Sequence, residues 1–256
     1  MIDPLFIACA AIAAILVGIS KSGFAASLGA VAVPLLSLVM PTPQAAGMIL
    51  PVLLVLDAAA LIIYRREVDW RIFWIIIPGA MAGTAIGWAL SAVVNEAAVG
   101  LVLGALSVLF ALDAWLPLRK KLERIPASRP WGWFWGTVAG FTSFISHTGG
   151  PPYQVYTLPL KLQPNIYAGT AAVVFAVINV SKLVPYYTLG QLSVSNLELA
   201  LALLPVAGLS MLAGVWMVRR IPAKVFYQIA YVMIFLLGLK LIYSGVTDLF
   251  LSGASA

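Results

Sequence analysis

Long runs of apolar residues, separated by short charged or proline- and glycine-rich breaks, constrain this chain more than any other feature. A helix needs about 20 residues to cross the hydrocarbon core of a bilayer, and the runs that reach this length are 44–64, 72–92, 97–117, 166–188, 195–218 and 223–247. Runs 5–20, 23–40 and 131–147 are marginal, and 150–160, with its three prolines, is too short. Hydrophobic residues make up 62% of the 256 residues and charged residues only 9%, which leaves too little polar surface for a soluble globule. The sequence therefore predicts an all-α integral membrane protein and excludes soluble enzymes, nucleic-acid-binding proteins and disordered chains.

The positions of lysine and arginine predict the orientation of the chain. Eleven of the 15 basic residues lie in the breaks at 65–71, 119–129 and 219–224, and cytoplasmic loops are rich in such residues. We therefore place these three loops in the cytoplasm and the loops at 93–96 and 191–196 outside, so that both termini are periplasmic. The net charge of +6 is then explained by the basic residues of the cytoplasmic loops. We therefore expect the protein to lie in the lipid bilayer and to bind no nucleic acid.

Other local features bound the chemistry. A single cysteine, Cys9, excludes an internal disulfide and a multi-cysteine metal site, and we expect no metal and no cofactor. The first residues lack a basic region and a cleavage site, so we expect run 5–20 to be a membrane segment rather than a removed signal. Gly79, Gly83 and Gly87 recur every fourth position, which predicts close helix packing. The sequence does not fix the oligomeric state, and a homodimer is compatible with it.

The two halves of the chain resemble each other around the basic linker. Gly18 matches Gly140 and Asp57 matches Asn179 at the same offset. The basic loop precedes the fourth segment of the first half but follows the equivalent segment of the second, so the halves are expected to be inverted in the membrane. We predict a first repeat at 1–117, a cytoplasmic linker at 118–130 and a second repeat at 131–250, each a short re-entrant helix pair plus three transmembrane helices. Inverted repeats are typical of secondary transporters, whose site lies near the midplane at the repeat interface.

Each half begins with two short segments joined by a polar, glycine-containing tip, at 18–24 and 140–152. Because run 150–160 is too short to span, we predict a re-entrant hairpin there and, by symmetry, at 5–40. The helix starts at such tips carry N–H groups with positive partial charge, which favour an anion. In the alternative, runs 5–20 and 23–40 both cross fully, Lys21 is an ordinary cytoplasmic loop residue, and 146–150 is an external turn.

The tips supply the candidate substrate-binding residues. Lys21 is the first choice, as a point charge with rotatable donors. His147, the single histidine, is expected to bind substrate or carry a proton, and a purely structural histidine is the alternative. The full set of candidate binding residues is Ser20, Lys21, Ser22, Gly23, Ser146, His147, Thr148, Gly149, Gly150 and Gln154.

Charged residues inside the apolar runs need a reason, because each costs roughly 2.5–3.5 kcal/mol at the centre of a membrane helix. Asp57, Asn179 and Lys182, with His147, are candidates for proton coupling or for a charge pair. The sequence does not choose whether Asp57 pairs with Lys21 or with Lys182. Lys182 lies toward the end of its segment, so the alternative is that it reaches out to the membrane surface.

The tip sequences Gly18…Lys21-Ser22-Gly23-Phe24 and His147-Thr148-Gly149-Gly150-Pro151-Pro152, with the two-half layout, resemble the TauE/SafE family over essentially the whole chain. These prokaryotic permeases are also called sulfite exporters or the four-toluene-sulfonate uptake family. The resemblance implies transport of sulfite or small organosulfonate anions across the bacterial inner membrane. Such an anion, with three oxygens, suits converging N–H groups, hydroxyls and one lysine.

We therefore expect a secondary transporter that works by alternating access, with the anion site at the two tips. The chain has no Walker-type motif, so an ion gradient, the membrane potential or the substrate gradient has to drive it. An anion channel is the alternative. An intramembrane enzyme that uses Ser20, Ser22 or Ser143 with His147 is a weaker one, because the tip lacks the usual nucleophile context, and we assign no catalytic residue.

Overall fold

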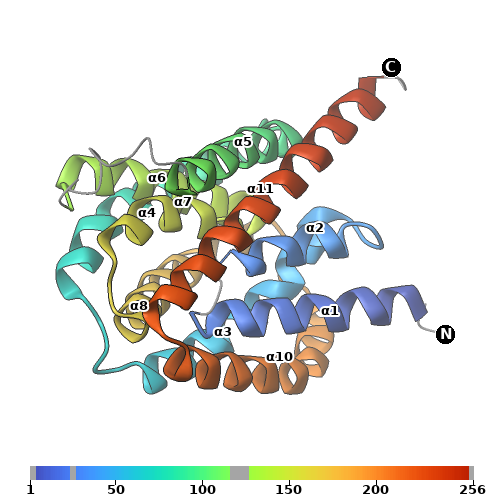
Figure 1. The fold of residues 1–256 in the computed structure, drawn as a ribbon. Coiled ribbons are helices and arrows are strands. Elements are labelled where there is room, and N and C mark those ends of the chain that lie inside the picture. Colours follow the sequence, from blue (N-terminus) through green and yellow to red (C-terminus); the bar gives the residue numbers. More distant parts are fainter. Residues whose placement is uncertain (1–3, 24–26, 116–126, 254–256) are drawn as a thin grey trace.

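The computed structural model describes residues 4–23, 27–115 and 127–253, which form helices and no strand. The helices are α1 (Pro4–Lys21), η1 (Leu28–Val31), α2 (Ala32–Leu36), α3 (Thr42–Ile63), α4 (Trp70–Leu90), α5 (Glu96–Trp115), α6 (Arg129–Ser146), α7 (Gly150–Thr157), η3 (Leu158–Leu160), α8 (Pro164–Ser181), α9 (Leu183–Thr188), α10 (Val194–Arg220) and α11 (Ala223–Gly253). Figure 1 shows the long helices packed around a centre that α3 and α8 cross. The all-α prediction is confirmed, and most of the predicted linker 118–130 lies outside the described residues.

Six helical stretches of the described chain are long and apolar enough to cross a membrane: Pro4–Lys21, Thr42–Ile63, Trp70–Leu90, Pro164–Thr188, Asn196–Arg220 and Ala223–Asp248. The outer surface carries large apolar side chains, among them Ile62 at 71% and Leu209 at 71% exposed. Because an apolar surface of this extent requires lipid rather than water, the protein is a multi-pass membrane protein. The run 97–117, expected to span, has a shorter described apolar stretch, Ala97–Leu112.

Helix ends follow local sequence signals. Asp69 Oδ1 accepts from the Ile72 N–H at 3.1 Å at the start of α4, and Ser193 Oγ accepts from the Asn196 N–H at 3.2 Å at the start of α10. Both are N-caps of the usual side-chain type. Prolines stand in the first turn of α3, α6, α7 and α8, where the missing N–H costs no helical hydrogen bond.

Helix α4 packs closely along α6 through its glycines, as their spacing predicts. A Cβ at Gly83 would overlap the backbone carbonyl of Thr137, and Gly79 and Gly87 also lie directly against α6. Helix α1 packs along α10 in the same manner, since a Cβ at Gly18 would overlap the carbonyl of Ala207. Backbones approach this closely only where side chains are absent.

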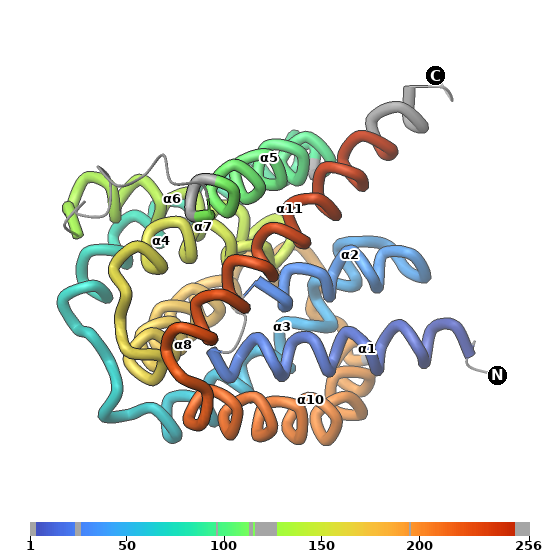
Figure 2. The backbone as a smooth tube through the Cα atoms, viewed as in Figure 1, coloured from blue at the N-terminus to red at the C-terminus, as the bar shows by residue number. Residues whose placement is uncertain are grey.

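The helix contacts of the first predicted half correspond to those of the second. Helix α1 lies along α10 and α6 lies along α4, while α5 packs on α11 and α3 on α8, an arrangement that can be followed along the tube in Figure 2. If α1–α5 correspond to α6–α11, the first two pairs map onto each other and the last two onto themselves. This pairing supports two related halves, whereas their inversion in the membrane stays a prediction.

The predicted short segments are short in the structure. Within the described residues 27–40 the chain forms η1 and the five-residue α2 instead of one long helix, and α7 has eight residues. Ser22, beside the C-terminal end of α1, faces Gly214 of α10, six residues, or about 9 Å, before α10 ends at Arg220. Helix α1 therefore ends about 9 Å before the end of the neighbouring α10, measured along the helix axis. The re-entrant course of the two hairpins stays a prediction.

Candidate functional site

Six polar side chains meet where helices α1, α6 and α8 end, beside the second half of α3. We call them the central cluster: Lys21, Asp57, Ser143, His147, Asn179 and Lys182. Continuous helices α1 and α6 carry Lys21 and Ser143 to the middle of the protein, and the break between α8 and α9 falls at Lys182. The cluster combines both predicted halves of the chain.

Asp57 is held between two donors. Lys21 Nζ forms an ion pair with Asp57 Oδ1, and Asn179 Nδ2 donates to Asp57 Oδ2 at 2.7 Å. The carboxylate is 2% exposed, so these contacts replace its water. The structure thus chooses Lys21 as the lysine that pairs with Asp57. Asp57 and Asn179, which this hydrogen bond joins, are also equivalent positions of the predicted repeat.

Lys182 is fully buried and donates to neutral groups. Its Nζ lies 2.7 Å from Ser143 Oγ, 3.0 Å from His147 Nδ1 and 3.1 Å from Asn179 Oδ1. Three acceptors match the three hydrogens of an ammonium group, so the geometry fits a protonated Lys182. The alternative in which this side chain reaches the membrane surface is wrong, because its exposure is 0%.

The contacts of His147 define its tautomer. Its Nε2 lies 3.1 Å from the carbonyl oxygen of Ala46, which only accepts, so Nε2 carries the hydrogen. Nδ1 is then free to accept from Lys182, which makes the imidazole neutral. The residue itself has φ 54°, the left-handed conformation at the C-cap of α6, which non-glycine residues adopt only where surrounding contacts hold them.

With Lys182 protonated, as its three acceptors allow, the central cluster carries one positive charge in excess. Lys21 and Lys182 contribute two, Asp57 removes one, and His147 is neutral. Among the described residues no second carboxylate contacts either lysine. A buried net charge is costly unless an opposite charge accompanies it. The cluster is therefore suited to holding an anion.

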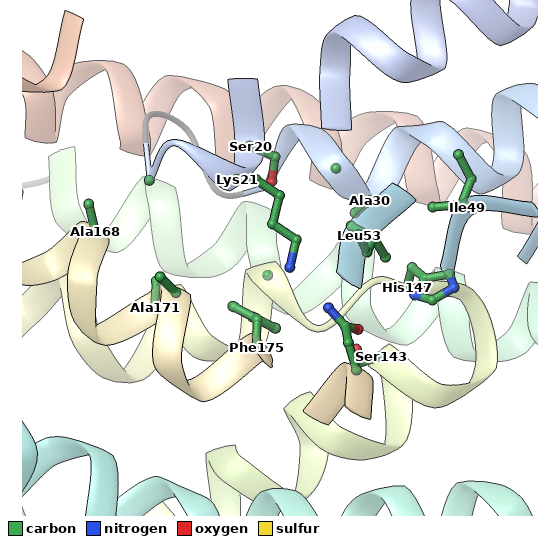
Figure 3. Close-up of a pocket in the computed structure, with 15 residues that line it drawn as sticks. Ser20, Lys21, Ala30, Ile49, Leu53, Ser143, His147, Ala168, Ala171 and Phe175 are labelled. Carbon is green, nitrogen blue, oxygen red and sulfur yellow. The ribbon is translucent and has the colours of Figure 1, made fainter. Parts of the chain in front are cut away.

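A cavity of about 50 Å³ lies beside the cluster. Its walls are formed by Ser20, Lys21, Gly23, Gly29, Ala30, Ile49, Leu53, Ser143, His147, Gly150, Ala168, Ala171, Ala172, Phe175 and Asn179, and Figure 3 shows Lys21 reaching into it from α1 with Ser143 and His147 across from it. One water needs roughly 10–15 Å³ on this measure. The cavity therefore has room for about three to five non-hydrogen atoms.

Donors remain free to face this cavity. The ammonium group of Lys21 uses one hydrogen for Asp57 and keeps two, and it lies 5.6 Å from the centre of the Phe175 ring. Ser143 Oγ accepts from Lys182, so its own hydrogen can point elsewhere. The first turn of α7 contributes less than the sequence suggested, because Pro151 and Pro152 have no N–H.

The structure brings part of the predicted binding set together. Ser20, Lys21, Gly23, His147 and Gly150 line the cavity. The remaining members do not. Ser22 donates to the Ile19 carbonyl, and Ser146 and Thr148 contact each other. Gly149 packs against the Ala139 carbonyl. Gln154 is fully buried but does not line the cavity.

Among the lining residues absent from that set, Ser143 and Phe175 bear most directly on binding, and the sequence held a signal for Ser143. Ser143 stands at the offset that relates Asp57 to Asn179, which makes it the repeat equivalent of Lys21. Phe175 has no such signal, because one phenylalanine in an apolar helix resembles any other. Tyr64 was also missed, and its hydroxyl donates to the Ser22 carbonyl at 2.6 Å and holds the turn after Lys21.

The family described as sulfite exporter TauE/SafE matches residues 10–241 of the chain. No curated protein and no solved structure matches the chain significantly.

Proposed function

Because the chain belongs to the sulfite exporter TauE/SafE family, we propose that it is a secondary transporter that moves sulfite or a small organosulfonate by alternating access. The chain is a membrane transporter of the sulfite-exporter type on the strength of that membership. The observation that carries the finer proposal is the excess positive charge of the central cluster beside a cavity of about 50 Å³. Such a site needs a small anion to become neutral.

In this proposal the anion is bound directly by Lys21 and Ser143. Lys21 has two hydrogens left for the anion's oxygens and Ser143 has one, whereas all three hydrogens of Lys182 are used within the protein. Lys182 therefore acts through its positive potential rather than through contact. A carboxylate at Asp57 keeps Lys21 charged and directed at the cavity.

The cavity's size favours the smaller member of the substrate class. Sulfite has four non-hydrogen atoms, which matches the room available, while a two-carbon sulfonate needs the walls to move. We therefore propose sulfite as the preferred substrate and organosulfonates as weaker ones.

The position of the cluster supports alternating access. The hydrogen bond from Asn179 to Asp57 joins the two predicted halves, so a rocking motion of one half against the other would open the site to one side and then to the other. Proton coupling through Asp57 or His147 is part of this proposal, since a proton on either would change the charge that the anion has to balance.

The orientation is likewise proposed. Loops 65–71, 119–129 and 219–224 face the cytoplasm of a bacterial inner membrane and both termini face the periplasm. Reporter fusions after residues 117 and 256 test this, because only the first is expected to be cytoplasmic.

Counterflow in proteoliposomes tests the transport proposal. Vesicles loaded with unlabelled sulfite receive external labelled sulfite, and a carrier accumulates label transiently whereas a channel does not. We expect accumulation by the wild type, its loss in Lys21→Gln, which keeps donors for Asp57, and no change in Lys224→Gln, an exposed lysine at the start of α11. Equilibration without accumulation would indicate a channel, and absence of any sulfur-anion flux would remove the substrate assignment.

A further inference from the structure

A second and larger cavity lies on the other side of the turn that carries His147. Its volume is about 440 Å³, and its walls come from α2, the start of α3, the start of α5 and the last part of α11. The polar residues in these walls are Ser37, Thr42, Ser146, Thr148, Lys240 and Ser244, with Asp248 at one end. We call it the outer cavity, because Ala97 in its walls adjoins the loop 93–96, which the charge pattern is expected to place outside.

The turn between α6 and α7 forms the wall between the two cavities. Ser143, His147 and Gly150 line the small cavity, whereas Ser146 and Thr148 line the outer one. Adjacent residues point to opposite sides here because His147 adopts a left-handed conformation. The turn shares this position with η1, whose Ala30 lines the small cavity and whose Val31 lines the outer one.

Lys240 gives the outer cavity a positive charge. It lies on α11, half-buried, and makes no hydrogen bond or ion pair within the part of the chain that the structure describes. Asp248, eight residues further along α11, lines the same cavity and interacts electrostatically with Lys240, so it offsets part of this charge at one end of the cavity. A lysine in a membrane-spanning helix is costly if it faces lipid, so a hydroxyl-lined cavity around it is expected to hold water.

We propose that the outer cavity is a second anion site, in which Lys240 holds a small oxyanion, sulfite or a sulfonate head group, before it passes the His147 turn. This inference rests on the proposed function. With room for several waters beside the ion, the outer site binds a hydrated anion weakly and with little selection by size. Selection then belongs to the small cavity beyond the turn.

Charge-selective labelling tests this site without requiring transport. In a Cys9→Ala background, Ser244→Cys places a thiol one helical turn from Lys240 on the same face of α11. Anionic and cationic methanethiosulfonate reagents of similar size are applied to vesicles without sulfite, which would itself cleave the reagents. We expect the anionic reagent to react faster, and Lys240→Gln to lower the ratio of the two rates by about tenfold. Lys224→Gln is the matched control and should leave the ratio unchanged.

The outcomes separate this inference from the proposed function. A ratio that Lys240→Gln does not change overturns the outer site even if sulfite is transported. Anionic lipid lowers the ratio at any site through its surface potential, so Lys240→Gln in the same vesicles is the reference; a fall that is larger in the protein that retains Lys240 than in Lys240→Gln identifies a lipid phosphate as the occupant, which also overturns the proposal. In vesicles that transport sulfite, Lys240→Gln should raise the KM for external sulfite several-fold with kcat unchanged, and an unchanged KM contradicts the proposal.

Discussion

Replacing Lys182 by methionine removes the excess charge of the central cluster while keeping the ion pair of Lys21 with Asp57. The side chains are similar in length, and Lys182 donates only to Ser143, Asn179 and His147. The variant therefore converts a site with one excess positive charge into a neutral site of nearly the same shape.

The expected magnitude follows from the geometry. Ser143 Oγ lies 2.7 Å from Lys182 Nζ, so an anion bound to that hydroxyl sits about 5 Å from the ammonium. At an effective dielectric constant of about 20, two unit charges at about 5 Å interact by about 3 kcal/mol. We therefore expect the affinity for sulfite to fall by about 100-fold.

Thermal unfolding of the purified protein at increasing sulfite concentrations measures this effect. A ligand that binds only the folded state raises the unfolding temperature as its concentration passes the Kd. We expect a sulfite-dependent rise for the wild type and for Lys224→Met, and none for Lys182→Met in the same range. A rise in Lys182→Met within threefold of the wild-type concentration dependence would refute the charge argument.

Three further predictions address packing, the turn after Lys21 and coupling. Gly83→Ala should lower thermal stability in detergent by about 1–3 kcal/mol, because the new methyl overlaps a backbone carbonyl of α6, whereas Gly208→Ala, with nothing near its Cβ position, should be neutral; equal effects would contradict the packing. Tyr64→Phe should cost about 1–3 kcal/mol and weaken sulfite binding, because a buried hydrogen bond to the Lys21 turn is lost; unchanged binding in a destabilised variant would separate the turn from the site. Asp57→Asn or His147→Ala should abolish the pH dependence of sulfite flux, and pH dependence retained in both variants would remove proton coupling from these residues.

The sequence predicted the composition of the central cluster better than its contacts. The offset that relates Asp57 to Asn179 selected two positions that touch each other in the structure. It did not tell which lysine pairs with Asp57, since this depends on where α1 ends relative to α3. The pattern of apolar residues does not indicate where α1 ends relative to α3.

The alternative in which Lys182 reaches the membrane surface is wrong for a local reason. A lysine near the end of an apolar run can turn outward or inward, and the break between α8 and α9 turns it inward to Ser143. Ser146 and Thr148 were grouped with His147 by their proximity in sequence. One left-handed residue sends them into a different cavity, and backbone torsion at a histidine cannot be predicted from residue type.

A crystal structure of the protein with selenite tests the central claim most directly. Selenite has the shape and charge of sulfite, and selenium can be located from its anomalous scattering. The account predicts one strong selenium peak in the small cavity, within hydrogen-bond distance of Lys21 Nζ and Ser143 Oγ, and its absence in Lys182→Met. A wild-type structure with an empty small cavity at saturating selenite, or with the peak unchanged in Lys182→Met, would contradict it.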